Sequence, residues 1–579
     1  MKLLFLLAIL LGYGVLATLV QVHCADLLTS DGECYLRIAV YTAKGDFRHA
    51  VFGHWSPLGP LMAVPLVAAG MVPRYAFRVM IGLWGAAAVL GVWRLAGRFG
   101  LGTARRAAAA ACAALMAAEY SADHRVDLLL AALLLFYLDA VLDERLARSW
   151  RCALGAGALG GAAYLAKLYA LPFFAVHYSL VVLARGWASR ARSAEKGVLP
   201  LSGSLALPAA ASPGPVRAPE ATLGGRGSRR AVALVRRWAA LWAVGLAGFA
   251  VVAAPWVEVL SAKYGRLTFG TAAAQTYAQF GPGSGNARWQ AITGLRTPPA
   301  GAYSIWQDAA FDFPAAPGRT SPFRSWAALR EQLRVTSHNL RDILAHLSSL
   351  DQFHLGLIAL ALTLPAFLAT LRRRETAFRH LVVALTVGTF CGGYAFVHAE
   401  DERFFWFIFF VAAVVALHFV GAVPRILGRL TPRIRGPQIR FVTLAAGLLA
   451  VFSFGSRPVA FLGQLFRAAP PGREHRLVAK VLAEWGVGGP LAATNWHDGL
   501  HTAYYLNAQY AGMPAAEDPA GIAAEMRATC AVTLLVWGEP RLAALLRADP
   551  RFVPVGTIPA RSLTGLRDDV AVFSLSKKP

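Results

Sequence analysis

Charged side chains are scarce in this chain: Asp, Glu, Lys and Arg make up 15% of its 579 residues. A soluble protein of this length needs far more charge, because its polar shell must cover the whole core. Cysteine is also scarce, with six residues and no Cys-x-x-Cys or Cys/His spacing of the kind that binds zinc. The composition therefore excludes an ordinary soluble protein and gives no sign of a zinc site.

Apolar residues are abundant instead, at 56% of the chain, with a mean hydropathy of +0.48. The bilayer core is about 30 Å thick, so a spanning helix needs roughly 20 apolar residues. Candidate spans lie at 2–22, 76–95, 105–119, 126–142, 152–166, 168–184, 238–260, 352–371, 379–397, 404–423 and 441–459. The proline-rich stretch 57–73 is a further, irregular candidate outside this count. We therefore expect a polytopic α-helical membrane protein with about 11 transmembrane helices, in the range 11–13.

Arginine-rich loops alternate with acidic loops along the chain, which carries a net charge of +25. The positive-inside rule places the basic loops in the cytoplasm of a bacterial inner membrane. The opposite, periplasmic face then receives segments 23–56, 119–126, 261–351, 398–403 and the tail. Because the basic residues follow this topology, we expect membrane lipids and no nucleic acid as partners.

Two regions follow from this pattern. Residues 1–460 form the transmembrane region and include a Pro/Gly/Ser/Arg-rich stretch, 185–237, that is typical of a flexible cytoplasmic linker. Residues 460–579 alternate strand patterns at 491–495, 532–538, 552–558 and 570–576 with helical patterns at 474–484, 521–528 and 541–548. This tail is expected to be a periplasmic α/β domain. The segment 495–499 is interpreted as a turn, with acceptor recognition as the alternative.

The first periplasmic segment holds Asp31-Gly32-Glu33. An Asp just outside the first helix can take a proton from a hydroxyl acceptor while a lipid substrate stays in the bilayer. The alternative is a helix cap or a solvated loop acid. Cys24 and Cys34 flank this segment, and a disulfide between them stays open.

Two cations share this face. Lys167 interrupts an almost uncharged run, 153–183, where an ionisable residue is expensive, so a functional role competes with simple snorkelling to the headgroups. Arg403 can bind a phosphate bidentately. The alternative for Arg403 is an ion pair with Glu400 or Glu402.

These motifs, in this order, resemble the GT-C glycosyltransferases that use polyprenyl-phosphate sugars, particularly the dolichyl-phosphate-mannose protein mannosyltransferases and the lipid A aminoarabinose transferases. The likeness covers about residues 1–425 and rests on Asp31, Tyr35, Ala39, Gly45-Asp46-Phe47, Pro57-Leu58, Asp127, Lys167 and Arg403. Many of those enzymes have two adjacent acids where this chain has Asp31-Gly32-Glu33. Either acid is therefore a candidate base, and we favour Asp31.

The resemblance implies a GT-C-like fold and an inverting glycosyltransferase. Asp31 would be the catalytic base, Lys167 and Arg403 would bind the donor phosphate, and Glu33 and Asp127 would orient the acceptor or hold a divalent metal ion. No cofactor is certain. Further candidates for the substrate loops are Tyr35, His54, His398, Glu400 and Glu402. The expected partners are a polyprenyl-phosphate-linked sugar and a glycan, lipid or protein acceptor. The rival hypotheses are a lipid or glycan transporter or flippase, and a non-catalytic envelope assembly protein.

The long segment 261–351 combines aromatic residues with glycine and proline. We expect either a lid over the substrates or an irregular loop packed on the periplasmic domain. His338, His346 and His354 recur every eight residues, which favours one face of a helix over a metal site.

Overall fold

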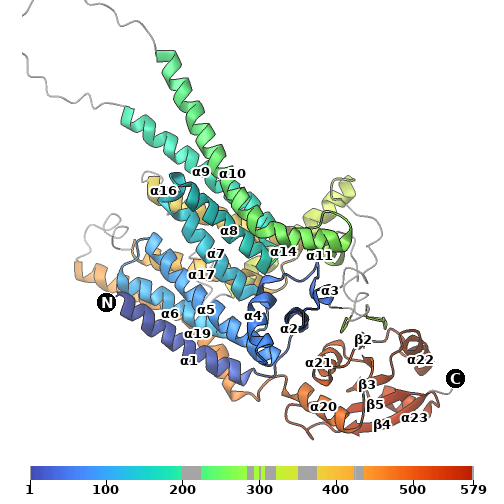
Figure 1. Ribbon diagram of the computed structural model, residues 1–579. Coiled ribbons are helices and arrows are strands. Elements are labelled where there is room, and N and C mark those ends of the chain that lie inside the picture. The colour runs from blue at the N-terminus through green and yellow to red at the C-terminus, as the bar shows by residue number, and fades with distance from the viewer. Residues whose placement is uncertain are drawn as a thin grey trace, which may run out of the picture.

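The computed structural model of the chain describes residues 2–197, 223–282, 293–298, 302–304, 306, 321–349, 374–422, 424 and 436–576. A bundle of long helices forms one part of the molecule, and a small sheet covered by helices forms the other (Figure 1). The helices α2 (Ser30–Ala43) and α3 (Phe47–Ala50) lie between the two parts.

The bundle consists of apolar helices that follow the hydrophobic runs of the sequence. They are α1 (Lys2–His23), α4 (Leu58–Ala68), α5 (Pro73–Arg98), α6 (Thr103–Tyr120), α7 (Asp127–Leu142), α8 (Trp150–Ala166), α9 (Ala170–Gly197), α10 (Leu223–Tyr264), α16 (Arg374–Val397), α17 (Trp406–Val420) and α19 (Gly436–Arg467). Among the described residues, 6 helices are long and apolar enough to cross a membrane. The chain is therefore a polytopic helical membrane protein. The span predicted at 352–371 lies outside the described residues, and the count of eleven stays a prediction.

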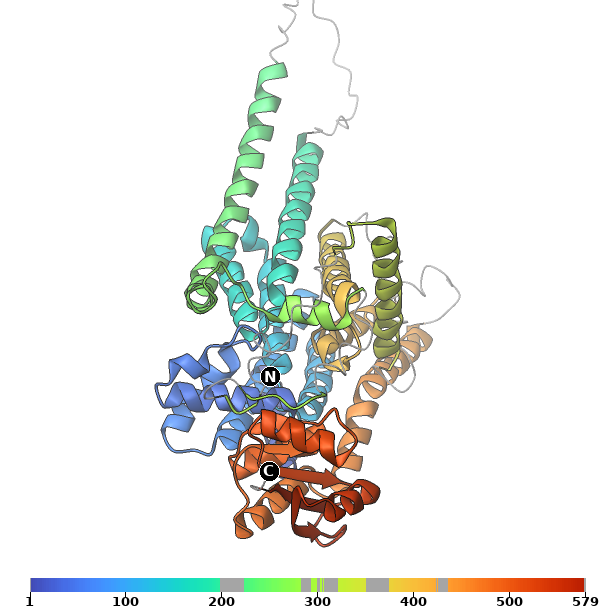
Figure 2. The ribbon, with the colours of Figure 1, turned by 90° about the vertical axis from the view of Figure 1, so that its right-hand side faces the viewer.

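The linker predicted at 185–237 is wrong at both of its ends. Helix α9 continues to Gly197 and α10 already begins at Leu223, because the Ala- and Arg-rich flanks are good helix formers. These ends of α9 and α10 project from the bundle on the side away from the sheet (Figure 2). The two ends of the bundle therefore carry different structures.

Small residues bring α8 and α10 into close contact. A Cβ atom added to Gly157 would lie 1.9 Å from the carbonyl oxygen of Gly245, and one added to Gly161 would lie 2.8 Å from that of Phe249. Packing of this kind compensates for the weak hydrophobic driving force between helices in a membrane. The Gly/Ala-rich composition of 152–166 therefore reflects its position beside α10.

The C-terminal part contains a mixed five-stranded sheet of order β2-β1-β3-β5-β4. Its strands are β1 (Leu491–Ala493), β2 (Tyr510–Gly512), β3 (Thr533–Trp537), β4 (Phe552–Ile558) and β5 (Val570–Leu575). The β1–β2 and β1–β3 pairs are parallel, and the β3–β5 and β4–β5 pairs are antiparallel. Sequence patterns predicted four of these strands and missed β2, which is too short to show a periodicity.

Helices cover both faces of this sheet. Leu491 and Ala493 of β1 pack with α20 (Arg473–Glu484) and α21 (Trp496–Leu506), whereas Ala492 packs with α22 (Pro519–Ala528) and α23 (Pro540–Ala548). The turn predicted at 495–499 is wrong, because these residues begin α21. The Asn495 side chain caps α21 by accepting hydrogen bonds from the backbone N–H groups of His497 and Asp498.

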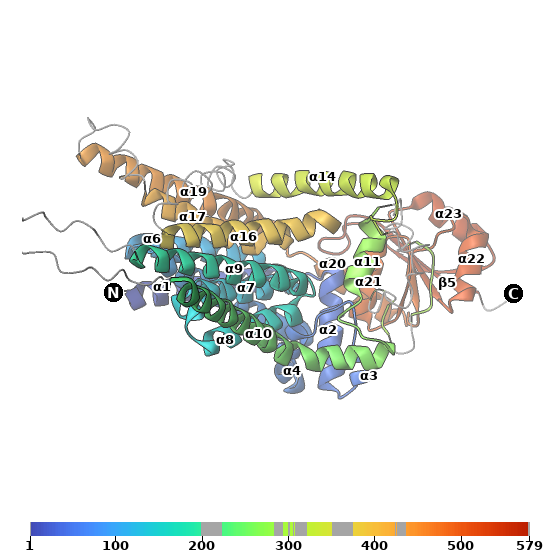
Figure 3. The same cartoon turned by 90° about the horizontal axis from the view of Figure 1, so that it is seen from above.

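Among its described residues, the segment 261–351 contains the helices α11 (Ala272–Phe280) and α14 (Trp326–Ser348), in place of a wholly irregular loop. Figure 3 shows α14 alongside α16. Asn339 of α14 donates to the carbonyl oxygen of Ala395, and the ring of His346 hydrogen-bonds those of Ala399 and Glu400. His338 and His346 thus lie on one helix, as predicted, and His354 lies outside the described residues.

The loops that hold the predicted site residues gather where the bundle meets the sheet domain. The 3-10 helix η2 (Glu402–Phe405) lies at this end, between α16 and α17. Tyr505 of α21 donates a hydrogen bond of 2.8 Å to the carbonyl oxygen of Asp26, and Arg476 of α20 lies 3.1 Å from the Asp26 carboxylate. Contacts with the sheet domain therefore fix the first loop.

Candidate active site

The first turn of α2 separates the two acids of the first loop. Thr29 caps the helix by accepting a hydrogen bond of 3.0 Å from the Gly32 N–H. A Cβ atom on residue 32 would lie 2.7 Å from Cβ of His124, so glycine lets α2 approach the loop before α7. Residues two apart on a helix point to nearly opposite sides. Asp31 and Glu33 therefore enter different environments.

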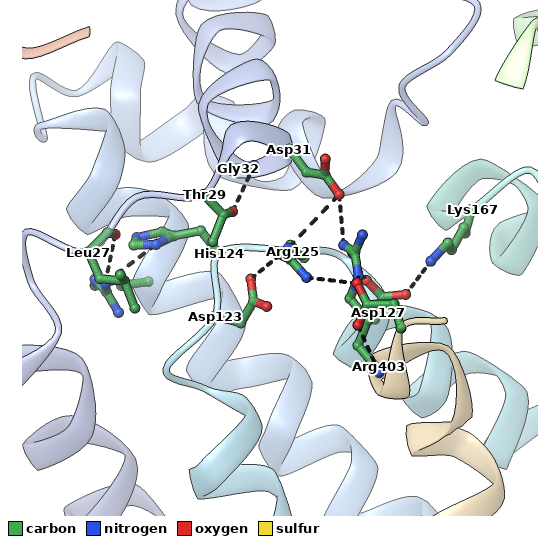
Figure 4. A network of polar contacts seen from close by, with 12 residues as sticks. Leu27, Thr29, Asp31, Gly32, Asp123, His124, Arg125, Asp127, Lys167 and Arg403 are labelled. Atoms are coloured by element: carbon green, nitrogen blue, oxygen red, sulfur yellow. Dashed lines mark hydrogen bonds and ion pairs between the residues drawn. The ribbon is translucent and has the colours of Figure 1, made fainter. Parts of the chain in front are cut away.

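Asp31 belongs to a charge cluster in which carboxylates and cations alternate (Figure 4). We define the charge cluster as Asp31, Asp123, Asp127, Asp401, Arg125, Lys167 and Arg403. Arg403 Nη1 lies 2.8 Å from Asp31 Oδ2 and 3.4 Å from Asp127 Oδ2, and its Nε lies 2.5 Å from Asp401 Oδ2. One guanidinium thus joins three acids from three separate segments.

Lys167 and Asp127 form the second part of the cluster. Lys167 follows the last turn of α8, and its ammonium group hydrogen-bonds Asp127, the first residue of α7. The Asp127 side chain is 2% exposed. The Lys167 nitrogen also lies 4.3 Å from the centre of the Phe404 ring, a cation–π contact. Lys167 is therefore held in place by specific partners, and simple snorkelling does not describe it.

Sequence reasoning missed the role of Arg125, Asp123 and Asp401. Arg125 lies 3.2 Å from Asp401, 3.4 Å from Asp123 and 3.9 Å from Asp31. These residues stand beside predicted ones, in Asp123-His124-Arg125-Val126-Asp127 and in Asp401-Glu402-Arg403. Spacing within one loop does not reveal contacts between loops, so the sequence held no signal that selected Asp401 over Glu400 or Glu402.

The cluster shifts the pKa values of two of its carboxyl groups in opposite directions. Burial raises the pKa of Asp31, but the nearby Arg403 and Arg125 outweigh this effect and lower it to about 2. Burial raises the pKa of Asp123 to about 6, because Arg125 and Arg403 offset only part of the desolvation. Asp31 is therefore a carboxylate at neutral pH, and Asp123 is protonated in part of the molecules near pH 6.

Glu33 lies outside the charge cluster. Its side chain is fully buried, accepts a hydrogen bond of 3.0 Å from the Tyr303 hydroxyl, and pairs with the ring of His501 in α21. The same Tyr303 pairs with the sheet domain, because its carbonyl oxygen accepts a hydrogen bond of 2.9 Å from the Tyr510 N–H. Glu33 thus joins α2 to the C-terminal domain.

Tyr35 and His54 lie near Asp31. Tyr35 follows Asp31 by one turn of α2 and packs edge-on against Trp55, at 5.4 Å between ring centres. Burial raises the pKa of Tyr35, which keeps the phenol protonated. His54 hydrogen-bonds Gln275 of α11, and its charged form would lower the pKa of Asp31. The substrate contacts predicted for these two side chains stay a prediction.

The late loop separates its acids among three environments. Glu402 lies 2.6 Å from Arg457 of α19, which Glu119 also faces, so this substrate-loop candidate falls outside the charge cluster. His398 stacks on Phe280, with ring centres 3.8 Å apart. His398 and Glu400 line a cavity of about 440 Å³ together with Arg334 and Arg341 of α14. The alternative considered for Arg403, an ion pair with Glu400 or Glu402, is wrong, since Arg403 pairs with Asp31, Asp127 and Asp401.

Neither a metal site nor a disulfide is formed among these residues. Within the described ranges, no group of three or more His, Cys, Asp and Glu side chains is placed to hold a metal ion. A divalent metal ion therefore stays an untested expectation. Cys24 and Cys34 are both buried free thiols, so the disulfide left open by the sequence is absent.

Comparison with solved structures identifies the architecture. The structure of ArnT from Cupriavidus metallidurans bound to undecaprenyl phosphate aligns over 98% of both chains with a TM-score of 0.55 and 14% sequence identity, and its apo form aligns over 97% of both with the same values. The chain has the GT-C fold.

Other comparisons add little to the GT-C fold. The archaeal oligosaccharyltransferase AglB from Archaeoglobus fulgidus aligns over 94% of this chain and 71% of its own, at 12% identity, with a TM-score of 0.48 that is too low to support an argument. No protein-family model and no curated protein sequence matches the chain. At 14% identity the ArnT likeness establishes the fold, and function has to be argued from the site.

Proposed function

We propose that this GT-C protein is an inverting glycosyltransferase that moves a sugar from a polyprenyl phosphate to a hydroxyl group of a cell-envelope glycan, lipid or protein. The observation that carries the proposal is the Asp31 carboxylate beside Arg403, with Lys167 in the same cluster, at one end of an apolar helix bundle. The fold shared with ArnT, whose structure holds undecaprenyl phosphate, supports a polyprenyl donor.

The reaction needs one base and a site for an anionic leaving group. The acceptor oxygen attacks the anomeric carbon, its proton passes to Asp31, and the bond from that carbon to the phosphate oxygen breaks. Because attack comes from the side opposite the phosphate, the configuration inverts. Arg403 and Lys167 stabilise the negative charge that develops on the departing polyprenyl phosphate. We place this site on the periplasmic side, because the basic loops lie on the opposite face, which the positive-inside rule assigns to the cytoplasm.

The test compares the wild type with Asp31→Asn, purified into lipid, in an assay for release of free polyprenyl phosphate. A panel of polyprenyl-phosphate sugars serves as donors, and a crude envelope extract serves as acceptor. Glu402→Gln is the matched control, because this acid lies on the same face but pairs with Arg457.

We expect release by the wild type and by Glu402→Gln, and a loss of about 10²–10⁴-fold in Asp31→Asn, the usual contribution of a general base. Equal release by all three proteins would remove Asp31 from the mechanism. A wild type that releases nothing from any donor, in an assay where a known transferase works, would favour a transporter, whose activity Asp31→Asn should barely affect.

A further inference from the structure

The cations that should bind the donor phosphate are already occupied in the charge cluster. Arg403 contacts Asp31, Asp127 and Asp401, and Lys167 pairs with Asp127. Four carboxylates face three cations, so a phosphate would enter a site that holds no surplus positive charge. A donor phosphate therefore competes with these carboxylates for their cations.

The same contact with Arg403 also limits Asp31 as a base. A carboxylate held by Arg403 at 2.8 Å, with a pKa of about 2, is a weak acceptor for the proton of a hydroxyl group. The contact that blocks the phosphate therefore also suppresses the base.

Of the three carboxylates that contact Arg403, Asp31 makes the fewest other hydrogen bonds among the described residues. Asp401 stands two residues from Arg403 and accepts a hydrogen bond of 3.3 Å from its backbone N–H, so the two move together. Asp127 is 2% exposed and is fixed by Lys167. Asp31 contacts Arg403 through Oδ2 and hydrogen-bonds no other described cation, and its side chain is 17% exposed, between Asp127 at 2% and Asp401 at 36%. Its other cationic neighbour, Arg125, lies 3.9 Å away.

We propose that the donor phosphate displaces Asp31 from Arg403, so that binding of the donor releases the base. In this exchange a phosphate oxygen replaces Asp31 Oδ2 as the acceptor beside Arg403 Nη1, and the Asp31 carboxylate turns toward the hydroxyl acceptor. The inference rests on the proposed function and assigns to Asp31 a second role, as the competitor that sets donor affinity. The base would then act only after a donor has bound.

The exchange makes an unusual prediction for Asp31→Asn. A base that does not compete for Arg403 affects the donor phosphate only through charge repulsion, and the gain from removing its charge persists without Arg403. A residue that competes with the phosphate for Arg403 weakens donor binding, so its neutral isostere strengthens it. The measurement is the Kd of undecaprenyl phosphate for the purified protein in lipid nanodiscs, by titration calorimetry. We expect Asp31→Asn to bind about tenfold more tightly than wild type, the scale of a coupling within one charge network.

Two further variants identify the source of the effect. Glu402→Gln removes a carboxylate of the same loop that pairs with Arg457, and its Kd should equal that of the wild type. Arg403→Gln should weaken binding of undecaprenyl phosphate. Adding Asp31→Asn to it should not tighten binding, because the cation for which Asp31 and the phosphate compete has been removed. Thermal unfolding of each variant shows that it is folded.

The exchange is overturned if Asp31→Asn binds undecaprenyl phosphate no more tightly than wild type, or if it gains as much with Arg403→Gln present. Either result leaves the proposed function intact when the wild type still releases polyprenyl phosphate from a donor. A wild type that releases none rejects the proposed function, and the exchange with it, whatever the binding data.

Discussion

The contact between Glu33 and the C-terminal domain gives the sharpest test of which acid is the base. Glu33 is fully buried, and its partners His501 and Tyr303 are 8% and 4% exposed. Removing one member of such a buried, charged hydrogen-bonded group usually costs about 3–5 kcal/mol, because its partners lose a contact that compensates for their desolvation. An isosteric amide keeps the shape and costs about 1–3 kcal/mol. Glu33→Ala should therefore destabilise the protein more than Glu33→Gln does.

The site of the damage is predicted as well. Both variants should loosen the C-terminal domain from α2 and speed its release by limited proteolysis, while the helix bundle stays folded. Glu33→Gln and His501→Asn should be non-additive by about 0.5–3 kcal/mol in a double-mutant cycle, since their side chains are in contact. Glu484→Gln is the control, because Glu484 is 61% exposed and pairs only with the surface residue Lys480 among the described residues.

Turnover separates this structural role from catalysis. Glu33→Gln should keep release of polyprenyl phosphate within about tenfold of wild type, whereas Asp31→Asn should lose about 10²–10⁴-fold. If Glu33→Gln is as inactive as Asp31→Asn and its C-terminal domain resists protease as in the wild type, Glu33 is the base and the reasoning fails.

Two other predictions concern pH and packing. Undecaprenyl phosphate should bind more tightly as pH falls through about 6, because Asp123, which faces Arg125, Arg403, Asp127 and Asp31, becomes neutral below its raised pKa. In calorimetric titrations from pH 5 to 8, Asp123→Asn should lose this component and keep only the titration of the phosphate itself; identical pH profiles would contradict it. Gly157→Ala should destabilise the bundle by about 1–3 kcal/mol through overpacking against α10. Gly155→Ala, whose added Cβ meets nothing within 4 Å, should not, and equal thermal unfolding of the two variants would contradict the packing argument.

Much of the fold could be predicted because transmembrane helices obey local rules. A run of apolar residues has to satisfy its own backbone hydrogen bonds inside the bilayer, so helices such as α5 and α17 follow from length and hydropathy. The strands β3, β4 and β5 were equally visible, from apolar runs of strand length. Helix α21 was missed, since its first residues, Asn495 to Gly499, have the composition of a turn until Asn495 acts as a cap.

Asp31, Lys167 and Arg403 could be recognised from their types and their positions at helix ends. The sequence left Asp31 and Glu33 as alternative bases in one loop, and only helix α2 shows that they point in different directions. Their partners could not be derived in this way. Arg403 meets Asp31 only because α2 and η2, more than 350 residues apart in the chain, are brought together by the bundle.

The sequence by itself therefore determined the membrane class, the order of the helices and the identity of the charged residues at one end, because each depends on neighbours along the chain. Only the tertiary structure decided which charges meet: Asp31 with Arg403, Asp127 with Lys167, Glu33 with His501, and Glu402 with Arg457. Ion pairs act over a few ångströms between segments that are distant in the chain. No local pattern records those distances, and the role of each acid in this site follows from them.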